Sequence, residues 1–116
     1  MFVISISRLG GSLTEGGLPM PHYIAVVEDG GPGKAVGVWF PDLPGCFSAG
    51  GDVDEALRNA EEALALYAEA EAIEGRALPH PRTLSVLRDD PAAAPDIRDH
   101  MVALVPLNKT AADAVE

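Results

Sequence analysis

Apolar residues in this chain form four short runs and one long periodic stretch. The short runs cover Tyr23 to Val27, Ala35 to Phe40, Cys46 to Ala49 and Met101 to Val105. Each contains β-branched or aromatic residues and is bounded by turn-forming residues, a pattern that predicts β-strands. The loop between the first two runs is short enough for a hairpin. Pro106 ends the last run.

The periodic stretch runs from Asp52 to Glu74 and predicts one long helix. Asp52 can cap its N-terminus, Glu55 completes a capping box, and Gly75 can take the left-handed conformation that closes a helix. Apolar residues recur at steps of three and four, so one stripe is expected to be buried. That stripe comprises Val53, Leu57, Ala60, Leu64 and Tyr67, widened by Ala56, Ala63, Leu66, Ala70 and Ile73.

The remaining segments are expected to contribute little to the core. Residues 83–88 could form a single helical turn, and residues 89–95 (DDPAAAP) predict a linker. Residues 1–19 are interrupted by four glycines and predict a flexible extension, which makes Met20 the expected natural first residue. The alternative is that residues 1–6 form an extra strand. Residues 107–116 carry little apolar surface and predict a frayed tail.

The order of elements is therefore β-β-β-α-β within residues 20–106, which form one domain. This order predicts an α+β fold: a single antiparallel sheet of three to four strands with one long helix on one face. Such a sheet leaves a second face or an edge that needs cover, so a homodimer or larger homo-oligomer is expected.

Charge narrows the possible partners. The formal net charge is −10, with 18 acidic and 8 basic residues. Unaided binding to nucleic acid or to an anionic membrane is not expected, because both need clustered Lys and Arg. The predicted helix holds eight carboxylates against Arg58 alone, which gives it a net charge of −7. A solvated helix face explains this bias, and so does a basic partner whose approach the field accelerates.

Catalytic and metal-binding patterns are not found. The histidines, His22, His80 and His100, lack other ligands at metal-binding spacing, so no metal or cofactor is expected. Cys46 has no adjacent base, and a small buried residue is the simpler interpretation. A single cysteine fits a reducing cytoplasm. No apolar run reaches the ~20 residues of a membrane span.

The segment from Val38 to Glu69 contains F-P-D-L-P-G-C at residues 40–46, then a polar, Gly-containing turn, then E-A-L at residues 55–57. This segment resembles the HicB antitoxin family. The resemblance covers about residues 20–106. The motif is also a folding device, since Pro41 and Pro44 stiffen a turn and Gly45 lets the backbone reverse.

The resemblance implies a role. HicB proteins bind and block HicA, a small basic ribonuclease that cleaves mRNA, so the chain is expected to be a cytoplasmic, non-enzymatic antitoxin. Several family members carry a C-terminal DNA-binding domain. Only ten residues follow Pro106 here, so direct DNA binding by this chain is not expected.

Four residues are candidate contacts with the toxin. The outward carboxylates of Glu62 and Glu69 are expected to steer it, and Leu43 and Phe47, beside the 41–45 turn, are expected to anchor it unless they prove to be core.

The alternative function is a stand-alone HicB-like domain with a nuclease-like or small-ligand role and no toxin. The layout is reminiscent of a partial ribonuclease-H-type fold. That fold gathers carboxylates around metal ions, whereas the predicted strands at 23–27, 36–40, 46–49 and 101–105 contain no Asp or Glu.

Overall fold

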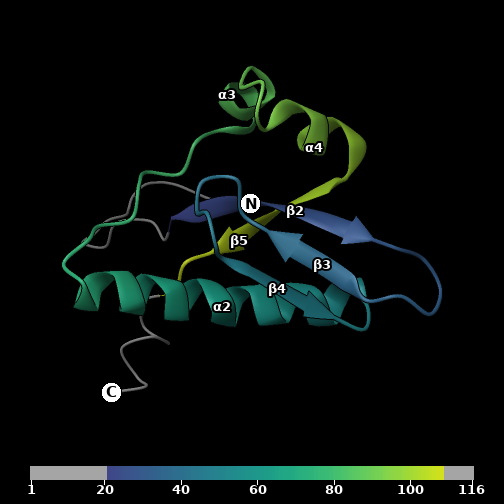
Figure 1. Cartoon of the computed structure of the whole chain (residues 1–116), viewed down its shortest axis with the longest axis horizontal. Helices are drawn as coiled ribbons and strands as arrows, with labels where there is room; N and C mark the ends of the chain where they lie inside the picture. Colours follow the sequence, from purple (N-terminus) through teal and green to yellow (C-terminus); the bar gives the residue numbers. More distant parts are fainter. Residues whose placement is uncertain (1–20, 109–116) are drawn as a thin grey trace, which may run out of the picture.

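Among the residues that the structure describes, a single four-stranded antiparallel sheet forms the centre of the molecule (Figure 1). The computed structural model describes residues 21–108. The strands follow the order β4-β3-β2-β5 across the sheet. Their bounds are β2 His22–Asp29, β3 Val36–Trp39, β4 Phe47–Gly50 and β5 Met101–Pro106. The predicted α+β fold and its single antiparallel sheet are confirmed.

Within residues 21–108, three helices cover the sheet. The long helix α2 (Val53–Ile73) lies on one face, and the short helices α3 (Leu84–Arg88) and α4 (Ala94–Asp99) lie on the other (Figure 1). The long helix and the turn at 83–88 agree with the predictions. The prediction of a linker over 89–95 misses α4, which begins within it. A six-residue helix is too short to show a hydrophobic period, although it buries Ile97.

Strand β2 is buried on both faces, which explains its unbroken apolar run. Tyr23, Ala25 and Val27 belong to the core under α2, whereas Ile24 and Val26 belong to the core under α3 and α4. Successive side chains of a strand point to opposite faces. The second face of the sheet is therefore partly covered by α3 and α4 of this chain. This cover was not expected from the sequence.

The turn between β3 and β4 points apolar residues into the core. Leu43 N–H donates to Phe40 O (3.0 Å), and Cys46 N–H donates to Leu43 O (3.0 Å). Gly45 has a φ of 89°, which other residues rarely adopt. Phe40, Leu43 and Cys46 are all buried beside α2. The F-P-D-L-P-G-C motif therefore acts first as a folding element.

Asp42, in the same turn, ties the turn to the segment that leads into α3. Its buried carboxylate accepts hydrogen bonds from the backbone N–H of Arg82 (2.8 Å) and from Arg82 Nε (2.6 Å). Arg82 also donates to Asp90 (2.9 Å), which follows α3. A charge-assisted, two-sided contact of this kind fixes geometry. It holds the α3–α4 segment in place against the sheet.

The ends of α2 confirm the predicted caps. Asp52 Oδ1 accepts a hydrogen bond from Glu55 N–H (2.8 Å), and Glu55 Oε1 accepts one from Gly51 N–H (2.6 Å). Gly75, with a φ of 77°, follows the last turn. Two otherwise unsatisfied N–H groups are thus paired at the helix start.

The predicted domain limits meet the structure only in part. The extension at 1–19, the proposed start at Met20 and residues 109–116 lie outside the described residues. The expectation that the tail begins after Pro106 needs correction, because Leu107 is buried in the core and its N–H donates to Pro21 O (2.8 Å).

Candidate protein-binding surfaces

The candidate chemical groups are occupied in structural roles. Cys46 is buried, and burial raises the pKa of its thiol to about 11. His100 packs edge-on against Trp39 with 5.5 Å between ring centroids. Within residues 21–108, no three His, Cys, Asp or Glu side chains gather as a metal site.

Strand β2 contradicts the expectation that the strands contain no Asp or Glu. The strand extends beyond its apolar run to include Glu28 and Asp29. Pairing with β3 continues through both residues, so the strand does not end where its hydrophobicity ends. Both are exposed near the hairpin loop, and Asp29 Oδ1 accepts a hydrogen bond from Gly31 N–H (3.0 Å).

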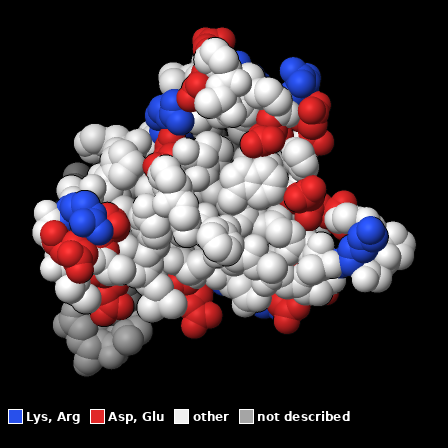
Figure 2. All heavy atoms as spheres, in the orientation of Figure 1, with Lys and Arg blue, Asp and Glu red and all other residues white. Residues whose placement is uncertain are grey.

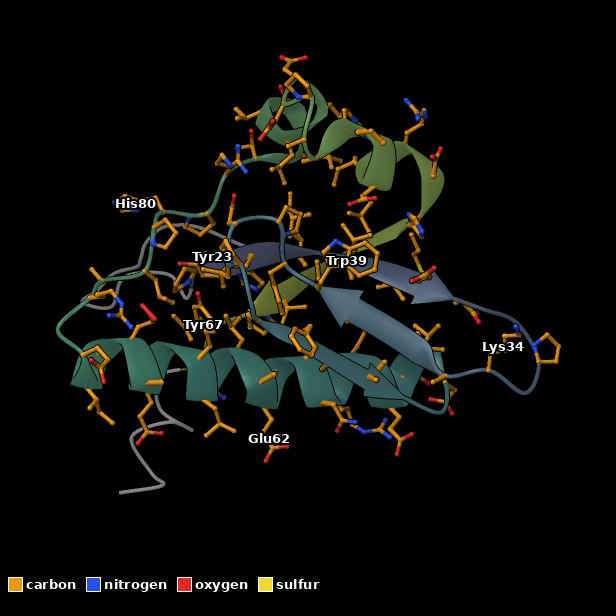
Figure 3. All side chains as sticks on the ribbon, in the orientation of Figure 1. Tyr23, Lys34, Trp39, Glu62, Tyr67 and His80 are labelled. Carbon is orange, nitrogen blue, oxygen red and sulfur yellow. The ribbon has the colours of Figure 1, made fainter. Side chains whose placement is uncertain are left out.

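The outward side of α2 combines charge with apolar side chains. Glu62, Leu66, Glu69 and Ile73 recur at steps of four and three along one stripe, which we name the acidic helix face. Glu62 is exposed and points away from the sheet in Figure 3, whereas Glu69 is half-buried. Leu66 is 52% exposed and Ile73 is 77% exposed.

The assignment of Leu66, Ala70 and Ile73 to the buried stripe is therefore wrong, because all three are exposed. The sheet contacts α2 through a narrower set of residues, centred on Ala56, Ala60 and Leu64, which are fully buried. A helix packed on one sheet buries only the side that faces the strands, so the opposite side stays in solvent. The sequence period alone placed the stripe correctly but could not limit its width.

Positive charge is scarce on α2. After the last turn, Arg76 Nε pairs with Glu71 at 2.6 Å, and the hydrogen bonds from Arg76 lower the pKa of that carboxyl. Arg58 lies on the solvent side near the other end. Among the described residues, neither Glu62 nor Glu69 on the acidic helix face forms an ion pair.

A second candidate surface lies on the opposite face of the sheet. Phe47 on β4 pairs in register with Trp39 on β3, and Phe47 is 70% exposed. We name these two residues the aromatic patch. Figure 2 shows an uncharged centre with Lys, Arg, Asp and Glu at its margin, and Figure 3, in the same orientation, shows Trp39 within it. An apolar centre with a charged rim is the usual anatomy of a protein interface.

Leu43 does not belong to either surface. It is 1% exposed and packs in the core under α2. Its expected role as an anchor is corrected, because its side chain cannot reach a partner in this conformation. The turn hydrogen bonds at Leu43 direct the side chain inward. Of the two predicted anchors, only Phe47 is accessible.

The structure places the predicted contacts on two sides of one sheet edge. Asn59 Nδ2 on α2 donates to Ala49 O on β4 (2.8 Å), so α2 lies alongside this edge. Phe47 emerges from the face of β4 opposite α2, whereas Glu62 and Glu69 lie on the far side of the helix. A partner would have to wrap around the β4 edge to touch all three.

Comparison with known proteins identifies the family. The HicB-like antitoxins of bacterial toxin–antitoxin systems match residues 23–115. The chain belongs to this family. The resemblance predicted from the sequence is thereby confirmed. The matched residues include the F-P-D-L-P-G-C turn and helix α2 of this chain.

Individual relatives agree with this assignment. The chain is similar to an uncharacterised 14.9 kDa protein of the rep-hol intergenic region of Haemophilus phage HP1 (strain HP1c1), at 32% identity over 88 residues. That alignment covers 76% of this chain and 62% of the phage protein, so the chain spans less than two thirds of that relative.

Solved structures share the fold. The N-terminal domain of Burkholderia pseudomallei antitoxin HicB matches with 26% identity and a TM-score of 0.58, over 75% of this chain and 98% of that domain. Burkholderia pseudomallei antitoxin HicB matches with 29% identity and a TM-score of 0.60, over 74% and 62%. A chain of the HicA3 and HicB3 toxin–antitoxin complex matches with 30% identity and a TM-score of 0.56, over 72% and 94%.

Among the helices of residues 21–108, none combines the length and the apolar character needed to cross a membrane.

Proposed function

We propose that this chain is an antitoxin that binds a basic, HicA-type mRNA-cleaving toxin and blocks it by occlusion. Family membership and the likeness to a chain of a HicA–HicB complex support the proposal. The observation that carries it here is the acidic helix face, where Leu66 and Ile73 stand exposed among carboxylates. The proposed role is non-enzymatic and cytoplasmic.

The proposed contact runs along the β4 side of the molecule. Carboxylates such as Glu62 and Glu69 attract a basic partner over a distance, and exposed apolar side chains hold it once water is excluded. Leu66 and Ile73 provide these apolar contacts on the helix side, and Phe47 provides them on the sheet side. The arrangement separates steering from anchoring.

Neutralising Glu62→Gln and Glu69→Gln together tests the steering. Association with the toxin, measured by stopped-flow at low salt, should slow several-fold while dissociation changes little, because exposed charges act mainly on encounter. The matched control neutralises two exposed carboxylates elsewhere, Glu28→Gln and Asp89→Asn. Equal association rates for both double variants would show that the acidic helix face is only solvated surface.

Truncating Leu66→Ala and Phe47→Ala tests the anchors. Each should accelerate dissociation from the toxin, by about tenfold where the side chain becomes fully buried in the complex. The control is Val86→Ala on α3. Val86 is 48% exposed, so this substitution also removes an exposed apolar side chain, but one that lies away from β4. If Val86→Ala weakens the complex as much as Leu66→Ala does, the proposed contact surface is wrong.

Two further properties belong to the proposal. The chain by itself should not cleave RNA, with or without added divalent metal. RNA cleavage that is lost on mutating Asp42 or Asp52 would favour the nuclease-like alternative. The chain should also associate with itself as a homodimer or larger assembly, whereas direct binding to DNA is not part of its proposed role.

A further inference from the structure

The two outer strands of the sheet differ in what they expose. Leu107 N–H donates to Pro21 O next to the β2–β5 ladder. Opposite pairs in an antiparallel ladder alternate between hydrogen-bonded and non-hydrogen-bonded. The register therefore directs the backbone groups of Ala103 and Val105 toward β2 and those of Val102 and Leu104 away from it. The outer side of β5 thus presents the N–H and C=O groups of Val102 and Leu104.

At the opposite edge, a side chain satisfies one outward backbone group. The same alternation, carried across the sheet, directs the backbone of Ala49 outward from β4. Asn59 Nδ2 donates to the carbonyl of Ala49, which confirms the direction and satisfies that group. Among residues 21–108, no side-chain hydrogen bond satisfies the outward backbone groups of Val102 or Leu104 on β5 in this way.

The β5 edge is also apolar. Its sequence, MVALVP, contains no charged residue, and its only proline is the last residue. Leu104 is 66% exposed and Met101 is exposed as well. Proteins commonly protect outer strands with charges, bulges or prolines within the strand. Strand β5 has none of these within its central residues.

A recess lies beside this edge on the α3 side of the sheet. Its volume is about 500 Å³, and its lining includes Ile24, Leu84, Val102 and Leu104. The backbone edge and the apolar recess are contiguous, because Val102 and Leu104 belong to both. An incoming strand could therefore form backbone hydrogen bonds and place an apolar side chain against the recess.

We propose that β5 pairs antiparallel with β5 of a second copy of this chain, so that two four-stranded sheets join into one. With the two-fold axis at Ala103, Val102 lies opposite Leu104 of the second copy, and Leu104 lies opposite its Val102. All of these residues direct their backbone groups outward, so each pair exchanges both N–H···O bonds. This interface rests on the self-association proposed above and assigns it a surface.

The absence of charge on β5 favours a second copy of this chain over a basic protein as the partner at this edge. A basic protein is drawn to the carboxylates of α2, whereas β5 carries no charge. The same edge is complementary to itself across a two-fold axis, which is how most homodimers close. Strands β4 and β5 lie at opposite ends of the sheet, so the dimer leaves the proposed toxin surface free.

The test uses the full chain and sedimentation equilibrium at micromolar concentrations. The wild type should dimerise. Leu104→Pro removes an outward N–H without removing a β2–β5 bond, and Leu104→Lys puts a charge at an exposed site. Each should weaken the dimer at least tenfold. The control, Ala49→Lys, adds the same charge to an exposed position on the same sheet face at the opposite edge, and it should dimerise like the wild type.

Amide exchange tests the pairing without mutation. The N–H groups of Val102 and Leu104 should exchange slowly in concentrated samples and faster on dilution, whereas the N–H of Phe47 on β4 should not depend on concentration. Added salt should strengthen the dimer, because it screens the repulsion between two chains of charge −10. It should weaken toxin binding.

The outcomes separate the two proposals. Folded Leu104 variants that dimerise like the wild type, with exchange at Val102 and Leu104 independent of concentration, would overturn β5 pairing while leaving self-association intact. A wild type that stays monomeric at all concentrations would overturn both. Neither result bears on toxin binding, which the α2 variants test separately.

Discussion

At the scale of single residues, two neighbours in one motif have opposite surroundings. Leu43 and Phe47 are four positions apart, yet Leu43 is 1% exposed and Phe47 is 70% exposed. The turn hydrogen bonds at Leu43 direct it into the core, while strand alternation directs Phe47 away from α2. Sequence placed both beside the same turn, and only the backbone path separates their roles.

This difference predicts opposite effects of truncation. Leu43→Ala should lower the free energy of unfolding by about 2–5 kcal/mol, because it leaves a cavity in a packed core. Phe47→Ala should cost less than about 1 kcal/mol, as expected for an exposed side chain. Urea unfolding followed by circular dichroism measures both. A larger loss for Phe47→Ala than for Leu43→Ala would contradict the assignment of core and surface.

Cys46 offers a second test at this scale. Its thiol is buried, its pKa is raised to about 11, and its Sγ lies 3.9 Å from Ala63 O. Because the thiolate is the reactive form, alkylation by iodoacetamide at pH 8 should be very slow in the folded protein and rapid in concentrated urea. The ratio of the two rates reports burial. Similar rates in both conditions would mean that the thiol is accessible.

At the scale of elements, the junction between β4 and α2 depends on one close approach. A Cβ on Gly50 would lie 2.5 Å from the backbone N of Ala56, which cannot move without displacing the helix. The neighbouring Gly51 would meet only the flexible side chain of Glu55, at 3.2 Å. The helix therefore lies where it does because β4 ends in a residue without a side chain.

Substituting the two glycines separately should show this. Gly50→Ala should destabilise the fold by about 1–3 kcal/mol or more, since overpacking forces the backbone to shift. Gly51→Ala should cost clearly less, because the Glu55 side chain can move. The melting temperatures of the two variants provide the comparison. Equal losses would indicate that general glycine flexibility, and not the Gly50–Ala56 contact, determines the effect.

At the scale of the whole molecule, hydrogen-bonded carboxylates predict the response to acid. Hydrogen bonds from Ala92 N–H and from Arg82 lower the pKa of Asp90, and Arg76 lowers that of Glu71. A carboxyl with a lowered folded pKa favours the folded state while it is ionised in both states. That stability is lost as the pH falls through the unfolded value toward the folded value. Stability should therefore decline below about pH 4.5.

Asp90→Asn provides the control for this pH dependence. The variant should be less stable than the wild type at pH 7, because it loses the charge-assisted bond to Arg82. The difference between the two proteins should shrink as the pH is lowered to 3, where Asp90 becomes protonated in the wild type as well. Chemical denaturation at several pH values measures this. A difference that is constant from pH 7 to pH 3 would show that ionisation of Asp90 contributes nothing.

The sequence by itself determined the local elements and the family. Residues close together in the chain determine the order of strands along the sequence, the long helix, both of its caps and the turn at 40–46. Their conformational preferences can be predicted one segment at a time. The same is true of the acidic bias of α2 and of Phe47 as a surface candidate.

Only the tertiary structure decided which surfaces are available. It buried Leu43, exposed Leu66 and Ile73, and added α4 over the second sheet face. It also distinguished Gly50 from Gly51 and, among residues 21–108, the β4 edge, where Asn59 satisfies the carbonyl of Ala49, from the β5 edge, where no side chain does so at Val102 or Leu104. Each outcome depends on contacts between segments distant in sequence, such as Asp42 with Arg82. A local pattern cannot specify them, because the same side chain is core or surface according to what packs against it.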